Sequence, residues 1–124
     1  MSKIKTHKEL DVYAMSFNAA MEIFNLTKSY PKEELYSLTD QIRRSSRSVS
    51  ANIGEAWSAR YYPKSFISKL IIAESEATET QVWLDYSFSC NYMSKTEHDK
   101  LYLEYDYIIG KLVNMLRNPD KWSI

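Results

Sequence analysis

The sequence has very few of the residues that break or cross-link a chain. Among its 124 residues are two glycines, three prolines and one cysteine. Sheet proteins need many turns, which draw on glycine and proline, so their scarcity favours a few long helices. The lone Cys90 excludes an internal disulfide and a metal cluster built from cysteine thiolates.

Long apolar runs and a net charge are lacking too. No run of about 18 uncharged apolar residues is present, so no membrane span is predicted. The first residues, MSKIKTHKELD, lack the apolar core of a secretory signal, and we expect a cytoplasmic protein without a membrane partner. The formal net charge is +0, which removes any global attraction to polyanions. With 44% hydrophobic residues, the chain suits one globular domain over residues 1–124.

The charges are nevertheless segregated along the chain. Residues 41–64 hold five cations and one carboxylate, a net +4, whereas residues 74–106 hold two lysines and eight carboxylates, a net −6. Adjacent helices commonly exchange such pairs. We therefore expect the two segments to face each other, either within one chain or between subunits.

The spacing of apolar residues predicts an all-α fold with four helices. Their expected ranges are about 8–28, 32–59, 63–89 and 94–116. Pro31 ends the first helix, and Pro63 suits the first turn of the third. Ser94 followed by Glu97 is typical of a capping box at the start of the fourth. The short connections predict an antiparallel, up-down four-helix bundle.

Each helix has a line of apolar residues at spacings of three and four, which indicates its core-facing side. The lines are Leu10, Tyr13, Phe17, Met21 and Phe24; Leu35, Leu38, Ile42, Val49, Ile53 and Ala56; Phe66, Leu70, Ala73, Ala77, Leu84 and Phe88; and Leu101, Tyr105, Ile108, Leu112 and Met115.

The first and third helices also have additional apolar faces. These consist of Val12, Met15, Ala19, Ile23, Leu26 and Tyr30 in the first helix, and of Ile67, Ile71, Ile72, Val82 and Trp83 in the third. A bundle buries one face of each helix, so the additional faces are expected at an interface between copies; coverage by loops or by the tail is the alternative. The candidate interface residues are Val12, Ile23, Leu26, Gly54, Ile71 and Trp83.

The segment Gln41 to Glu55, QIRRSSRSVSANIGE, combines arginines with small residues on the second helix. Serine and glycine are poor helix formers, so such a run is typical of a face that another helix approaches closely. A catalytic site is not indicated, because Glu55 has no histidine or second carboxylate at a useful spacing.

Two interpretations of the arginines stay open. In the first, Arg43, Arg44 and Arg47 pair with acidic residues of the third helix, within or between subunits; the candidates are Glu74, Glu76 and Glu79. In the second, a basic strip binds the phosphates of RNA or DNA without reading their sequence. The candidate nucleic-acid-binding residues are Arg43, Arg44, Arg47, Arg60 and Lys64. Tyr61 and Tyr62 suit stacking on unpaired bases or packing at an interface.

Asn52 and Glu55 lie at the edges of the core line and are expected to be buried, so they need partners. We expect a structural polar network of Asn52, Glu55, Arg60 and Glu79 that fixes the turn into the third helix; a functional role is the alternative. His98, between two acidic residues, is expected to be solvated. No metal, cofactor or small-molecule substrate is predicted.

Two stretches resemble the 23S rRNA intervening-sequence protein family. The first is YPKEELYSLTDQIRR with Ser48-Val49, Asn52-Ile53, Glu55 and Arg60 behind it, and the second contains Phe66, Leu70, Ala73, Ser75, Glu79, Thr80 and Gln81. Their order and spacing hold over about residues 9–116. The chain departs from the family pattern at Ser50, Gly54-Glu55-Ala56 and Cys90-Asn91-Tyr92-Met93.

The resemblance implies an up-down four-helix bundle that assembles into a ring-like homo-oligomer, pentameric in relatives, with no established enzyme activity. It also implies similarity to the accessory protein of diversity-generating retroelements, which works with a reverse transcriptase through a basic surface. The expected function is therefore non-enzymatic binding of RNA, DNA or a nucleic-acid enzyme. The alternative is a scaffold whose arginines are consumed in subunit contacts.

Overall fold

The computed structural model describes residues 4–122, and within this range the chain forms four long α-helices and no strand. The helices are α1 (Asp11–Thr27), α2 (Leu38–Ser58), α3 (Pro63–Ser89) and α4 (Lys95–Arg117), and the short 3-10 turns are η1 (His7–Glu9), η2 (Lys32–Glu34) and η3 (Pro119–Lys121). The prediction of an all-α fold is confirmed.

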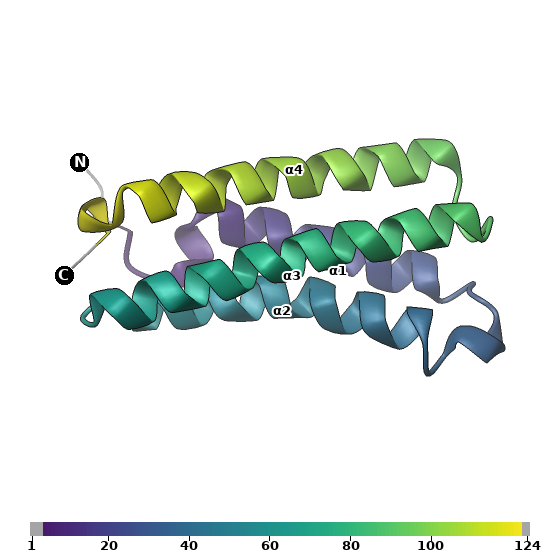
Figure 1. Ribbon diagram of the computed structural model, residues 1–124, viewed down its shortest axis with the longest axis horizontal. Coiled ribbons are helices and arrows are strands. Elements are labelled where there is room, and N and C mark those ends of the chain that lie inside the picture. Colours follow the sequence, from purple (N-terminus) through teal and green to yellow (C-terminus); the bar gives the residue numbers. More distant parts are fainter. Residues whose placement is uncertain (1–3, 123–124) are drawn as a thin grey trace.

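The helices lie lengthwise beside one another and alternate in direction (Figure 1). α2 packs against α1 and α3, and α4 completes the arrangement by packing against α3 and α1. α1 and α3 therefore occupy opposite corners. The start of α1, the turn from α2 to α3 and the end of α4 all lie at one end of the molecule (Figure 1).

The helix ends follow from local chemistry. Ser94 and Glu97 form the predicted capping box: the backbone N–H of Glu97 donates to the Ser94 hydroxyl at 3.1 Å, and the backbone N–H of Ser94 donates to the Glu97 carboxylate at 2.9 Å. α2 begins at Leu38, later than expected, because Ser37 has φ −126° and ψ −102°, outside the helical region. The residues before Ser37 form the separate turn η2.

The core lines predicted for α2, α3 and α4 are buried apart from one residue in each of the first two. Leu35 precedes α2 and is exposed, and Phe88 is exposed in the last turn of α3. α2 also buries Ser45, whose hydroxyl oxygen accepts a hydrogen bond from the Thr80 hydroxyl of α3 at 2.9 Å. Small serines thus let α2 and α3 pack closely while their polar atoms stay paired.

The two apolar lines of α1 are reversed relative to the prediction. Val12, Ala19 and Ile23 were expected at an interface but are buried in the core, whereas Phe17 and Met21 were expected in the core but are exposed. Periodicity detects both lines and does not tell which of them faces inward. The inward line contains small residues such as Ala19, which allow α1 to lie close to its neighbours, whereas the bulky Phe17 and Met21 lie outside.

His98 links α3 to α4 and is not solvated as expected, since its side chain is 15% exposed. Its Nε2 lies 2.8 Å from an oxygen of Asp85 on α3, and its Nδ1 lies 2.9 Å from an oxygen of Asp99 on α4. A neutral imidazole donates from only one nitrogen, so hydrogen bonds to both carboxylates require the imidazolium. Burial lowers the pKa of His98, but the hydrogen bonds and charges of Asp99 and Asp85 outweigh it and hold this pKa above its ordinary value. Lys95 pairs with Asp99 on the same helix at 2.6 Å.

We expect the stability of the fold to fall as the pH rises through the pKa of His98. Because folding raises this pKa, the contribution is complete below the pKa of an unfolded histidine, about 6.5, and is lost above the folded pKa. The loss should be at most about 1 kcal/mol, since both carboxylates are half exposed. Urea unfolding at a series of pH values checks this. In His98→Gln the free energy of unfolding should no longer fall over this pH range. If the variant and the wild type show the same pH dependence, His98 does not form the proposed ion pairs with Asp85 and Asp99.

Candidate functional site

Three cations of α1 and α2 surround one aromatic ring. The ring belongs to Phe24 of α1, and the distances to its centroid are 4.8 Å from Arg43 Cζ, 4.9 Å from Lys28 Nζ and 5.5 Å from Arg47 Cζ. We call Phe24, Lys28, Arg43 and Arg47 the Phe24 cluster. Cations within about 6 Å of an aromatic face are attracted by its quadrupole, which holds these side chains in place.

Arg43 is the member of the Phe24 cluster that is also fixed by a hydrogen bond from its side chain. Its Nε donates to the hydroxyl of Thr27 at 2.8 Å, and that hydroxyl donates to the backbone carbonyl of Phe24 at 3.0 Å. The terminal N–H groups of the guanidinium have no acceptor among residues 4–122, so they remain available. None of the three cations forms an ion pair with a carboxylate in the described part of the chain.

Arg44 behaves differently from its neighbours. Its guanidinium pairs with two carboxylates of α3, Glu79 at 2.7 Å and Glu76 at 3.4 Å. Glu79 also accepts a hydrogen bond from the indole of Trp83 at 3.3 Å. Of the three arginines of α2, only Arg44 pairs with the acidic residues of α3 within one subunit.

A surface groove of about 510 Å³ runs along the arginine side of α2. We call it the arginine groove; it is lined by Leu35, Tyr36, Thr39, Asp40, Arg43, Arg44 and Arg47. Tyr36 stands at its edge and is 90% exposed. The groove therefore combines guanidinium groups with an aromatic ring. Guanidinium groups bind phosphate oxygens in a planar, bidentate manner, and an exposed aromatic face is able to stack on a base.

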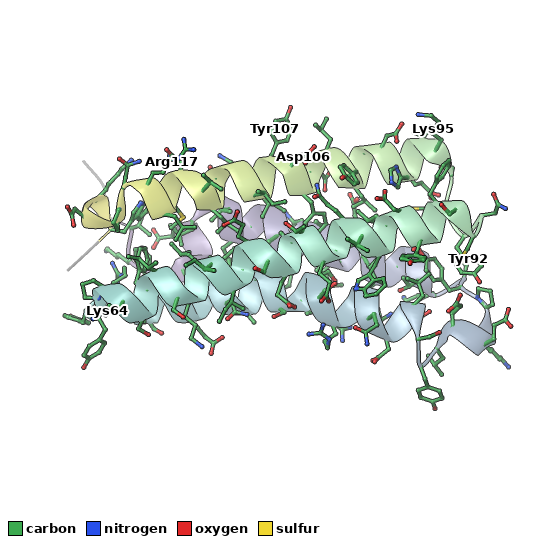
Figure 2. All side chains as sticks on the ribbon, viewed as in Figure 1. Lys64, Tyr92, Lys95, Asp106, Tyr107 and Arg117 are labelled. Carbon is green, nitrogen blue, oxygen red and sulfur yellow. The ribbon has the colours of Figure 1, made fainter. Side chains whose placement is uncertain are left out.

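Arg60 and Lys64 do not belong to this groove. Arg60 lies about 25 Å along the helix direction from Arg43, at a rise of about 1.5 Å per residue. Its Nε donates to the Trp57 carbonyl at 2.7 Å and its guanidinium stacks on the Trp57 ring at 3.3 Å. Lys64 is exposed at the end of the bundle where α2 passes into α3 (Figure 2). The five cations proposed from the sequence are therefore split between the two ends of α2.

The predicted polar network does not form. Asn52 is buried, but its amide donates to the carbonyl and hydroxyl of Ser48 in the same helix, at 2.8 and 3.0 Å. Glu55 is exposed and lies 3.5 Å from Lys69. Arg60 is held by Trp57, as described above, and Glu79 by Arg44. Each of the four side chains is paired outside the expected network, and the partner of Asn52 lies one turn away in the same helix.

The candidate interface residues are in three kinds of environment. Val12 and Ile23 lie inside the subunit core and are not available to a second copy. Leu26 and Trp83 are partly buried against that core. Gly54 and Ile71 remain at the surface: Gly54 helps to line a groove of about 520 Å³ between α1 and α2, and Ile71 lies on the outer side of α3.

Other kinds of site are not indicated in the described range. Residues 4–122 contain no group of three His, Cys, Asp or Glu side chains placed to hold a metal ion. None of the helices in that range is both long and apolar enough to cross a bilayer.

The arginines of the site were predicted from the sequence, but their surroundings were not. Phe24, Lys28 and Tyr36 were not among the predicted site residues. The spacing of Phe24 and Lys28, four residues apart on one helix, places them on the same face and was a usable signal. The contact of this face with Arg43 and Arg47 depends on which apolar line of α1 faces the core. The sequence pattern does not determine that orientation.

Comparison with known proteins gives the same fold and a family. Residues 8–114 match the family model described as 23S rRNA-intervening sequence protein. A crystal structure from Bacteroides thetaiotaomicron, of a protein with unknown function from the S23 ribosomal protein family, is 32% identical to this chain with a TM-score of 0.77. The alignment covers 86% of this chain and 95% of that one. No curated protein matches. The chain therefore belongs to the 23S rRNA-intervening sequence protein family.

Proposed function

We propose that this is a non-enzymatic nucleic-acid-binding protein that holds RNA phosphates on the Phe24 cluster and in the arginine groove. The observation that supports this most strongly is the gathering of Lys28, Arg43 and Arg47 around one ring without a carboxylate partner. Like charges held so close repel one another, and a bound phosphate relieves that repulsion. Arg43 presents its terminal N–H groups already oriented, which reduces the entropy lost on binding.

The choice of RNA over DNA rests on the family. Contacts to phosphate are independent of sequence and shared by RNA and DNA. The family name refers to an intervening sequence of 23S rRNA, and the solved relative is a protein with unknown function from the S23 ribosomal protein family. The same basic surface suits an accessory protein that holds nucleic acid for an enzyme, as in the retroelement proteins that the sequence resembles.

Titration with a short fluorescein-labelled RNA tests the proposal. Fluorescence anisotropy should report binding at low salt that weakens steadily as salt is added, because phosphate contacts release bound counterions. Binding that does not respond to salt, or no binding at low salt, would contradict the proposed function.

We further propose that the chain assembles into a ring-like homo-oligomer, a pentamer as the resemblance implies. Two separate apolar surfaces support this: Phe17 and Met21 on α1, and Ile71 and Val82 on α3, are all exposed. The two helices occupy opposite corners of the bundle. Two different surfaces that meet produce a head-to-tail contact, and such contacts make a closed ring when the rotation between subunits closes.

Light scattering tests the assembly. We expect a mass several times the 14.6 kDa of one chain. Replacing both Ile71 and Val82 by glutamate should produce monomers that keep their helical circular dichroism, because both side chains are exposed and buried charges in a subunit contact are strongly unfavourable. A monomeric wild type would exclude the ring.

A scaffold without nucleic acid is the second candidate, and the pairing of Arg44 with Glu76 and Glu79 favours it. The two candidates differ in what Arg43 and Arg47 contact after assembly. If Arg43→Ala with Arg47→Ala dissociates the oligomer, these arginines serve subunit contacts. If the mass is unchanged and RNA binding falls, they serve nucleic acid.

A further inference from the structure

We propose that the arginine groove binds an unpaired segment of RNA, with one base stacked on Tyr36 and the adjoining phosphates on Arg43 and Arg47. This rests on the proposed function and adds to it the form of the nucleic acid and the residue that selects it. The juxtaposition of a free aromatic ring with guanidinium groups in one groove carries the inference.

The side chain of Tyr36 does not contribute to the packing of the bundle. It is 90% exposed, and within residues 4–122 it makes no ring contact or hydrogen bond. The other tyrosines near this end of the bundle are engaged: Tyr30 is buried and packs against Tyr92, and Tyr92 donates to Glu34 at 2.9 Å. Tyr86, which is 56% exposed near Ser37 and Leu38, contacts the Trp83 ring at 5.7 Å between centroids, so Tyr36 is the tyrosine at this end without a ring partner among residues 4–122.

The backbone places this ring beside the arginines and off the helix. Ser37, with φ −126° and ψ −102°, separates Tyr36 from α2, so the side chain does not take part in the packing of that helix. Arg43 and Arg47 are one helical turn apart and line the same groove. A strand bound in the groove is thus within reach of both the Tyr36 ring and the two guanidinium groups.

Stacking selects for an unpaired strand. Inside a duplex both faces of each base are covered by neighbouring bases, and a side chain at the surface reaches only edges and phosphates. Unpaired bases expose their faces and stack on aromatic side chains irrespective of sequence. Asp40, which also lines the groove, repels phosphates, so we expect the phosphates to contact Arg43 and Arg47.

The test compares one short labelled RNA without self-complementarity, alone and annealed to its complement. Wild type should bind the single strand more tightly than the duplex. Tyr36→Ala should weaken single-strand binding about tenfold, a stacking contribution typical of one base, and leave duplex binding unchanged. Tyr36→Phe keeps the ring and should restore binding. Tyr62→Ala tests the other candidate ring, which is 69% exposed at the other end of α2, and Tyr107→Ala is the matched control, because Tyr107 is 57% exposed on α4 (Figure 2). Circular dichroism confirms folding of each variant.

The outcomes separate this inference from the proposed function. If wild type and Tyr36→Ala bind the single strand and the duplex alike, stacking is excluded while phosphate binding stands. If Tyr62→Ala lowers binding and Tyr36→Ala does not, the base site lies at the other end of the helix and the inference is wrong. Loss of the oligomer in Tyr36→Ala would make Tyr36 a subunit contact and also overturn it. Absence of any RNA binding at low salt would remove the inference and the proposed function together.

Discussion

Replacing Ile23 by alanine is expected to lower the free energy of unfolding by about 2–5 kcal/mol, the range for truncating a large aliphatic side chain in a packed core. Ile23 lies on α1, is 1% exposed and belongs to the core shared by the four helices. Removing its outer carbons leaves a cavity that the rigid surroundings fill only in part. Urea unfolding followed by circular dichroism measures the loss.

Met21→Ala is the matched control on the same helix. Both substitutions are compared in the monomeric Ile71→Glu/Val82→Glu background, where no subunit contact covers Met21; it is 45% exposed, so its truncation should change the free energy of unfolding by no more than about 0.5 kcal/mol. The pair reports directly on which face of α1 turns inward. A large loss for Met21→Ala with a small one for Ile23→Ala would show that the helix has the orientation first expected from the sequence.

The second large effect is expected at the Phe24 cluster. Arg43→Ala combined with Arg47→Ala should weaken binding of RNA at low salt by at least tenfold, since each hydrogen bond to a charged group contributes about 1.5–3 kcal/mol. Arg47 is exposed, but Arg43 is half-buried and donates to Thr27 of α1, so circular dichroism must show that the double variant keeps its fold. Fluorescence anisotropy with the labelled RNA measures the change.

The control for charge alone is Lys8→Ala combined with Arg117→Ala. Both cations are exposed and away from the groove; Arg117 lies at the end of α4 (Figure 2). This variant has the same net charge as the arginine variant. An equal loss of affinity in the two would mean that overall charge, and not the Phe24 cluster, holds the RNA.

The sequence predicted the architecture well because the apolar lines chosen as the inward faces of α2, α3 and α4 are the ones that the bundle buries. In α4, Leu101, Tyr105 and Ile108 follow one stripe and are buried, whereas Leu103 and Tyr107 lie outside it and are exposed. α1 has two apolar stripes, and the choice between them was wrong. That choice depends on how closely the neighbouring helices approach, which is a property of the assembled bundle and not of the helix alone.

The site was predicted in part for a related reason. Arg44 pairs with Glu76 and Glu79, two of the partners that the acidic third helix offered. Arg43 instead meets Phe24, which had been placed in the core line of α1. Because that line does not face the core, the Phe24 ring lies at the edge of α1 next to α2, where it contacts the cations. The wrong choice of the inward face of α1 therefore explains two wrong predictions: Val12 and Ile23 were expected at an interface, and Phe24 was expected in the core.

The polar residues of α2 show a second limit. Asn52 was expected to need distant partners, but its amide bonds to Ser48 one turn away. Ser46 and Ser50 likewise donate to carbonyls three residues earlier. Bonds between a side chain and its own helix satisfy buried polar groups without any tertiary network. A serine-rich helix therefore gives little information about which polar residues meet across the bundle.

The salt dependence of RNA binding, measured side by side for wild type and the Arg43→Ala/Arg47→Ala variant, tests the central claim most directly. A plot of the logarithm of the association constant against the logarithm of salt concentration has a slope set by the number of phosphates contacted. If each arginine neutralises one phosphate of a single strand, the slope should become shallower by about 1.4, at about 0.7 per contact. An identical slope in the two proteins would show that the Phe24 cluster does not contact the phosphates, and would contradict the account.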